Sequence, residues 1–141
     1  MACCNSIVVD APREAVWKIL RNFHDLSWAT GVVESCEPVG DLGPTTPGAK
    51  RILNGVFHET LVGLDDAECS VSYTIDDGAG TPVASDKVSG YVGQIQAFPL
   101  TSTGGTFVLW TSRWQDSQGG VKDFCDPIYQ AILASLQARF A

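Results

Sequence analysis

The sequence has little positive charge. Its 141 residues include nine lysines and arginines against sixteen aspartates and glutamates, which gives a formal net charge of −7. No basic cluster is present, so we expect neither nucleic acid nor an anionic membrane surface as a partner. The apolar runs are too short to cross a bilayer, so we expect no membrane insertion either.

Cysteines are present, but their spacing is not that of a metal site or a disulfide framework. They number five, an odd count, and no C-x-x-C pair occurs: Cys3, Cys4, Cys36, Cys69 and Cys125. Adjacent cysteines such as Cys3 and Cys4 chelate a metal poorly. No signal peptide is recognisable, so we expect reduced thiols, no bound metal and a cytoplasmic location.

Sequence motifs for nucleotide, metal or serine-nucleophile chemistry are also missing. There is no phosphate loop, dinucleotide fingerprint, H-E-x-x-H or G-x-S-x-G. The two histidines, His24 and His58, have no nucleophile or ligand cluster nearby in the sequence. We therefore expect no cofactor.

What the chain does contain is a wide apolar stripe near its C terminus. At 100° per residue, the apolar residues of the stretch from Asp123 to Phe140 fall on one side of a helix. Asp126 is a suitable N-cap and Pro127 a suitable first helical residue. A stripe this wide needs a partner surface.

The upstream chain supplies such a surface within one domain, residues 1–141. A short strand at Ser6–Val9 precedes a helix capped by Asp10 and a second short helix over Asn22–Trp28. About six strand-like runs then follow one another through turns, at residues 32–39, 50–53, 57–64, 70–76, 87–98 and 106–114. Strands joined in sequence by tight turns predict an antiparallel sheet. We expect this α+β chain to wrap a curved sheet around the terminal helix, with a cavity between them.

Several stretches, taken in order, resemble a known family. They are I-x-V-x-A-P-x-E-x-V-W-x-I-L (7–20), G-A-K-R-I-L (48–53), E-T-L-V-G-L-D (59–65), Y-T-I (73–75) and V-L-W (108–110). Together they resemble the polyketide cyclase/dehydrase branch of the START-like, birch-pollen-allergen-like superfamily. The resemblance implies a helix-grip fold, in which a seven-stranded antiparallel sheet grips the C-terminal helix around an apolar cavity. It does not fix the activity, because members include carriers, receptors and enzymes.

The same resemblance brings out three polar residues as catalytic candidates. Arg51, Glu59 and Tyr91 lie in motifs similar to those of lachrymatory-factor synthase, a plant isomerase of this superfamily, in which the matching residues act on the ligand. A cavity carboxylate can move a proton, a guanidinium can hold an enolate or carboxylate, and a phenol can donate to a carbonyl.

A structural ion pair between neighbouring strands is the alternative role for Arg51 and Glu59. A two-residue turn at Asn54-Gly55 would pair Arg51 with His58 and put Arg51 and Glu59 on opposite faces. Only a longer loop or a bulge lets both side chains face the cavity.

A second group of residues is predicted to bind the ligand through apolar and aromatic contacts. Its members are Trp28, Phe57, Leu61, Tyr73, Trp110, Tyr129 and Leu133. Ordinary core packing is the alternative for each. As a pocket lining they suit a flat, apolar, partly oxygenated molecule, and the loop at 77–86 is a candidate gate.

Three functions stay open: a carrier of a small hydrophobic molecule, a cyclase, dehydratase or isomerase working without a cofactor, and an accessory domain that binds another protein. The sequence does not separate a monomer from a homodimer.

Overall fold

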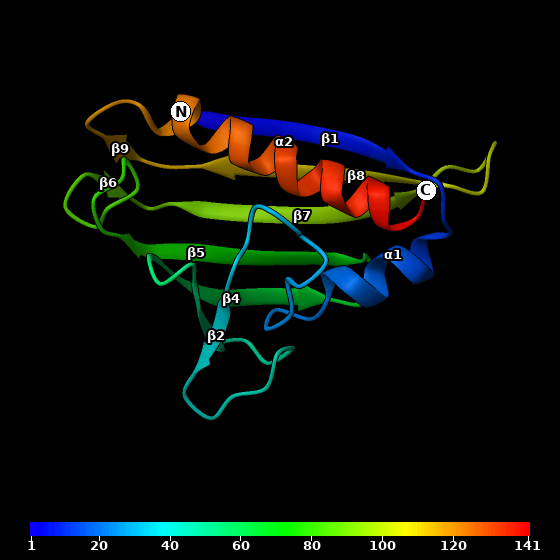
Figure 1. The fold of residues 1–141 in the computed structure, drawn as a ribbon, viewed down its shortest axis with the longest axis horizontal. Helices are drawn as coiled ribbons and strands as arrows, with labels where there is room; N and C mark the ends of the chain where they lie inside the picture. The colour runs from blue at the N-terminus through cyan, green and yellow to red at the C-terminus, as the bar shows by residue number, and fades with distance from the viewer.

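The computed structural model describes residues 1–141 and contains a seven-stranded antiparallel sheet that grips one long helix (Figure 1). Its strands are β1 (Ala2–Val9), β2 (Cys36–Val39), β3 (Lys50–Leu53), β4 (Phe57–Asp65), β5 (Ser70–Gly78), β7 (Val92–Pro99) and β8 (Thr106–Arg113). They lie in the order β1-β8-β7-β5-β4-β3-β2, so the first strand is beside the last. The expected helix-grip fold is therefore confirmed.

The long helix, α2 (Val121–Arg139), packs along the sheet beside β1 (Figure 1). It begins earlier than expected: Gly120 is the N-cap, and Pro127 lies inside the helix. Proline inside a helix removes one backbone hydrogen bond, at a cost of about 3 kcal/mol. The buried stripe explains why the helix tolerates it, because Val121 and Cys125 extend the apolar face back by two turns.

Asp126 consequently has a different role from the predicted N-cap. Its Oδ1 accepts a hydrogen bond from the Asn5 side chain at 2.9 Å, and its Oδ2 pairs with Lys122 one turn earlier at 2.5 Å. Asn5 is on β1, so this carboxylate fastens the first turns of α2 to the edge of the sheet.

Only one short helix follows the first strand, and the second helix predicted at Asn22–Trp28 is absent. The helix α1 (Arg13–Leu20) has Pro12, not Asp10, at its N-cap. After it, the chain forms successive turns. The Asn22 side chain accepts a hydrogen bond from the His24 amide, and the Asp25 side chain accepts one from the Ser27 amide. Such local bonds compete with helix formation, and the segment crosses in front of the sheet instead (Figure 1).

Two strand boundaries also differ from the expected ones. The long strand predicted at 87–98 is broken at Gly90, whose φ is 66°. It gives β6 (Val88–Ser89), which pairs with β9 (Asp116–Ser117), and then β7. The strand predicted from Val32 begins only at Cys36, because residues 32–35 are held by the Asn54 side chain and not by a neighbouring strand.

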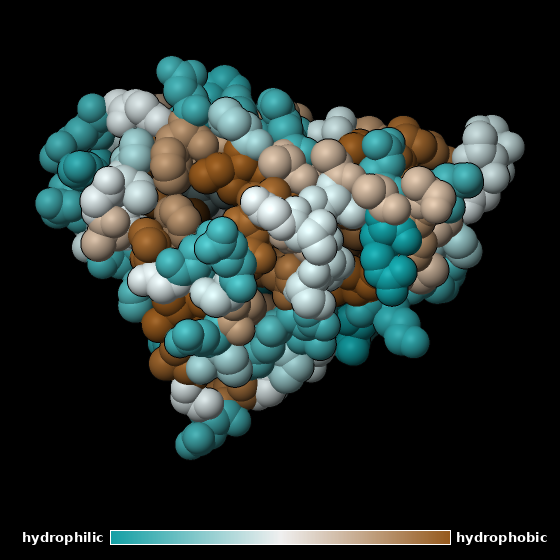
Figure 2. Space-filling view, viewed as in Figure 1, coloured by the Kyte–Doolittle hydropathy of each residue, from teal (hydrophilic) through white to brown (hydrophobic).

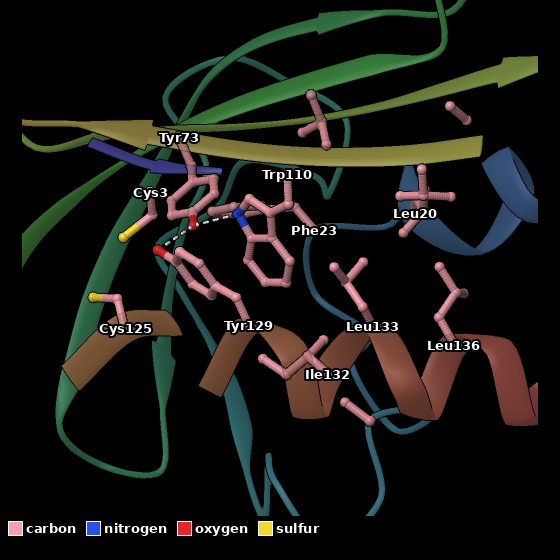
Figure 3. Packing of buried hydrophobic residues seen from close by; sticks show 14 of the residues in the cluster. Cys3, Leu20, Phe23, Tyr73, Trp110, Cys125, Tyr129, Ile132, Leu133 and Leu136 are labelled. Carbon is pink, nitrogen blue, oxygen red and sulfur yellow. Dashed lines mark hydrogen bonds between the residues drawn. The ribbon is translucent and has the colours of Figure 1, made fainter. Parts of the chain in front are cut away.

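The main hydrophobic core lies between α2 and the face of the sheet that it covers (Figure 3). Leu133 and Leu136 of α2 are 2% and 0% exposed, and Val108 of β8 is 0% exposed. Replacing a leucine so buried with alanine costs about 2–5 kcal/mol, so this contact holds the helix on the sheet. Neither helix combines the length and apolar character that crossing a membrane requires.

Candidate functional site

A cavity lies between the sheet, α2 and residues 21–35, which we call the crossing segment. Its volume is about 130 Å³, and 20 of its 25 lining residues are hydrophobic. A single water needs roughly 10–15 Å³ of such space, so the cavity has room for a much larger guest. Figure 2 shows hydrophobic residues between α2 and the segment that crosses in front of the sheet.

The cavity opens to solvent where its hydrophobic lining is only half-buried. Trp28 and Val32 come from the crossing segment, Phe57 from the start of β4, and Phe124 and Ile128 from the first turns of α2. The rings of Phe57 and Phe124 lie 6.1 Å apart, centroid to centroid. Three separate elements therefore form an apolar mouth.

The hairpin between β3 and β4 brings Arg51 and Glu59 to the cavity side together. Leu53 pairs with Phe57, so three residues connect the strands instead of two. Arg51 is then directly opposite Glu59, and His58, on the other face, is exposed. The extra residue is the longer loop that the sequence required for both side chains to face inward.

Arg51 and Glu59 form a buried ion pair, 8% and 6% exposed. The Arg51 Nε and Nη2 atoms both donate to Glu59 Oε1, at 2.9 and 2.7 Å, while Nη1 donates to the Phe23 carbonyl at 2.9 Å. The guanidinium also lies 3.8 Å over the Phe23 ring. Both side chains line the cavity, and the pair ties β3 and β4 to the crossing segment.

Burial raises the pKa of the Glu59 carboxyl above its ordinary value, and the Arg51 guanidinium opposes part of that rise. Arg51 bonds only Oε1, so the other carboxylate oxygen has no partner from the guanidinium. A carboxyl of this kind beside a cavity is able to exchange a proton with a bound molecule.

Hydrogen-bonded hydroxyl groups beside the cavity join the sheet to α2 (Figure 3). Trp110 Nε1 donates to the Tyr73 hydroxyl at 3.0 Å, which is 3.0 Å from the Tyr129 hydroxyl. The Tyr129 hydroxyl contacts that of Tyr91, which donates to Cys125 Sγ at 3.6 Å. We call these five residues the tyrosine cluster. All donors can point one way along it, from Trp110 to Cys125, and such chains strengthen one another.

The groups of the tyrosine cluster stay protonated near neutral pH. Burial raises the pKa values of Tyr73, Tyr91 and Tyr129 above the ordinary tyrosine value. Burial also raises the pKa of the Cys125 thiol to about 11. This thiol is therefore not a ready nucleophile.

A glycine on β7 makes room for the ring of Tyr73. Gly93 pairs with Tyr73 across the β5–β7 ladder, and a Cβ atom at Gly93 would come within 2.3 Å of the tyrosine ring. Any side chain at this position would push the ring, and with it the hydroxyl that meets Tyr129, out of place.

The predicted site residues divide into two sets. Arg51, Glu59, Trp28, Phe57, Tyr73, Trp110 and Tyr129 line the cavity. Tyr91, Leu61 and Leu133 do not: Tyr91 lies behind Tyr129, and the two leucines belong to the core. Whether any of them binds a ligand stays a prediction.

Several lining residues were not in the predicted site. Val71 and Ile75 share the inward face of β5 with Tyr73, and their alternation was a usable signal. Phe23, Val83 and Cys125 also line the cavity. Phe23 and Val83 lie in turns, and Cys125 lies in the first turns of α2, before Pro127, where the sequence did not predict a helix. No group of three histidine, cysteine, aspartate or glutamate residues is placed to hold a metal.

Asn54 holds the segment over the cavity from the β3 side. Its φ is 54°, and its Oδ1 accepts hydrogen bonds from the amides of Glu34 and Ser35 at 2.7 and 3.2 Å. Its Nδ2 donates to the Val32 carbonyl at 3.1 Å. One side chain thus satisfies three backbone groups of the segment.

Comparisons with known proteins agree with this architecture. The structure resembles that of a protein from Nitrosospira multiformis, with 40% identity and a TM-score of 0.96 over 100% of this chain and 97% of that one. XoxI from Bacillus cereus matches at 19% identity and a TM-score of 0.78, over 99% and 94% of the two chains. A protein from Thermobifida fusca matches at 21% identity and a TM-score of 0.79, over 99% of this chain and 92% of that one. Below 25% identity, such likeness shows the fold alone.

None of the curated proteins matches the chain. The sequence does match the family described as polyketide cyclase / dehydrase and lipid transport, over residues 5–141. The match spans nearly the whole chain and agrees with the fold and the apolar cavity, so this protein belongs to the polyketide cyclase / dehydrase and lipid transport family.

Proposed function

We propose that the protein binds a small hydrophobic molecule in the cavity between the sheet and α2. The observation that carries the proposal is the cavity itself, open at an apolar mouth and lined by 20 hydrophobic residues out of 25. Pockets of this composition, with few polar groups, are typical of small-molecule sites. The family description, which includes lipid transport, supports the same function.

The aromatic lining supports a ring-containing ligand. Trp110 and Tyr129 stack with centroids 4.1 Å apart, and Phe57 and Phe124 face each other at the mouth. Aromatic side chains gain additional contact energy from an inserted ring. We therefore choose naphthalene derivatives as probes.

Isothermal titration calorimetry with 2-naphthol tests the proposal. Ile128→Trp, which enlarges a half-buried residue at the mouth, is expected to weaken binding at least about tenfold by filling the cavity. Val62→Trp is the matched control, because Val62 is 47% exposed and does not line the cavity. Equal binding by both variants, or no binding by the wild type, would contradict the proposal.

A cofactor-free cyclase, dehydratase or isomerase is the second candidate, favoured by the buried carboxyl of Glu59 with its raised pKa. In this scheme Glu59 moves a proton and Arg51 stabilises the developing oxyanion. Tyr73, which lines the cavity, is better located than Tyr91 to supply a phenol. Turnover of a ketide or aldehyde that Glu59→Gln abolishes while binding persists would support this reading. Binding without turnover would support a carrier.

A further inference from the structure

The charges around the cavity leave no free cation. Among its 25 lining residues, three carry charge: Asp25, Arg51 and Glu59. Their formal sum is one negative charge. Arg51 is the single positive group, and two of its nitrogen atoms, Nε and Nη2, bond Glu59. Asp25, at the mouth, is exposed.

An anionic ligand would therefore meet an unfavourable environment. To reach Arg51, a carboxylate would have to lie beside Glu59, because the Nε and Nη2 atoms of the guanidinium already bond that residue. Nη1 is engaged by the Phe23 carbonyl, and the Phe23 ring covers one face of the guanidinium at 3.8 Å. Removing a carboxylate from water without a new counter-charge is unfavourable and weakens binding.

A neutral oxygenated ligand meets no such penalty. The hydroxyls of Tyr73 and Tyr129 are neutral and retain lone pairs beyond the bonds of the tyrosine cluster. The guanidinium has five N–H groups, of which three are engaged by Glu59 and the Phe23 carbonyl. A hydroxyl or carbonyl group of a ring compound can use these positions without bringing charge into the cavity.

We propose that the cavity selects neutral oxygenated ring compounds and rejects carboxylates, and that Glu59 sets this selectivity by neutralising Arg51. The inference rests on the proposed function and specifies the ligand class for the same cavity. It predicts that removing the charge of Glu59 alone converts the cavity into a carboxylate site, because the Arg51 guanidinium then lacks its counter-ion.

Calorimetric titration near neutral pH with 2-naphthol, 2-methoxynaphthalene and 2-naphthoate tests this selectivity. These probes share one ring system, and only 2-naphthoate is charged. Wild-type protein is expected to bind 2-naphthol at least about tenfold more tightly than 2-naphthoate. Glu59→Gln is expected to raise the affinity for 2-naphthoate at least about tenfold. The double variant Arg51→Met/Glu59→Gln, which has neither charge, is expected to lose that gain.

The wild-type comparison decides the matter even if Glu59→Gln does not fold, and Glu59→Asp, which keeps the charge, should keep the wild-type preference. Equal or tighter binding of 2-naphthoate by the wild type would overturn the charge selectivity while leaving the proposed cavity function intact. A folded Glu59→Gln variant with unchanged 2-naphthoate affinity would overturn the role of Glu59. Failure of all three probes to bind would overturn the proposed function and this inference with it.

Discussion

The two polar groups of the cavity differ in charge and in what they join. Arg51 and Glu59 form a buried ion pair that links the β3–β4 hairpin to the Phe23 carbonyl in the crossing segment. The tyrosine cluster is uncharged and links β5 and β8 to α2 (Figure 3). One group connects the hairpin to the segment over the cavity, and the other connects the sheet to the helix.

The difference in charge determines which of the two groups we expect to stabilise the fold. A buried ion pair is weak evidence for stability, because the loss of hydration can exceed the attraction between the charges. Neutral hydroxyls that satisfy one another carry no such penalty and fasten the elements that they join. We therefore expect the protein to fold when both residues of the ion pair are replaced together by apolar ones. We expect the tyrosine cluster to contribute to the free energy of unfolding and to have little effect on the choice between charged and neutral ligands.

The largest expected effect comes from breaking the ion pair on one side. Glu59→Leu leaves the Arg51 guanidinium buried without a counter-charge and should lower the free energy of unfolding by roughly 3–5 kcal/mol. Adding Arg51→Met should restore most of the loss, because the double variant buries no charge. Urea denaturation measures both. If the double variant is as unstable as the single one, the pair is a structural requirement.

A smaller loss is expected from Gly93→Ala, which disturbs the tyrosine cluster. The new methyl group would overlap the Tyr73 ring, and such overpacking costs roughly 1–3 kcal/mol. Gly43→Ala is the control, because no atom lies within 4 Å of a Cβ atom there. Thermal denaturation should separate the two variants, and equal melting temperatures would show that the Tyr73 ring adapts freely.

Single hydroxyl deletions should have a more modest effect. Tyr129→Phe removes the hydroxyl between those of Tyr73 and Tyr91 and should cost roughly 0.5–1.5 kcal/mol or slightly more. Tyr91→Phe removes a hydroxyl nearer the Cys125 end of the row of hydrogen bonds, so it should lower the free energy of unfolding by less. Because Tyr91 does not line the cavity, its variant should also leave 2-naphthol binding unchanged. A larger binding defect in Tyr91→Phe than in Tyr129→Phe would reverse our assignment of the two residues.

The smallest expected effect is the pH dependence that Glu59 contributes. Its pKa is raised by burial in the folded state, so the folded protein holds this proton to a higher pH than the unfolded chain does. The resulting stability is present below the ordinary glutamate pKa and is lost as pH rises through the raised pKa.

The difference in free energy of unfolding between wild type and Glu59→Gln isolates this contribution. We expect the wild type to gain stability relative to the variant as pH falls from neutral toward the ordinary glutamate pKa. Carboxyls with lowered pKa values, such as Asp66 and Asp126, act in both proteins and cancel. A relative loss on acidification would mean that the Arg51 charge outweighs burial at Glu59.

The architecture could be predicted from the sequence because the apolar periodicities of the strands and of the terminal helix are visible without knowledge of turn lengths or side-chain hydrogen bonds. It misled at Pro127, where local preference indicates a helix start but the buried side chains of Val121 and Cys125 require an earlier one. It also misled at Asn22 and Asp25, whose side chains bond nearby amides and favour turns.

The lining was predictable on the strands, where alternation determines the direction of a side chain, and at Tyr129, where the apolar stripe of α2 does so. Tyr73 lies within β5 and lines the cavity as predicted, and Glu59 also lines it although the β4–β5 register shifts between His58 and Glu59. Tyr91 lies between the break at Gly90 and the start of β7, where alternation does not apply, and its hydroxyl meets Tyr129 outside the cavity lining. The register of Arg51 depended on one extra loop residue that composition does not reveal.

Nuclear Overhauser measurements on the protein with 2-naphthol test the central claim most directly. We predict contacts from the naphthalene protons to the methyl groups of Ile75, Ile95 and Ile128, which line the cavity from β5, β7 and α2. The exposed Val62 methyls should show none. Contacts confined to Val62 and other surface residues, with the cavity isoleucines unaffected at saturation, would contradict the account.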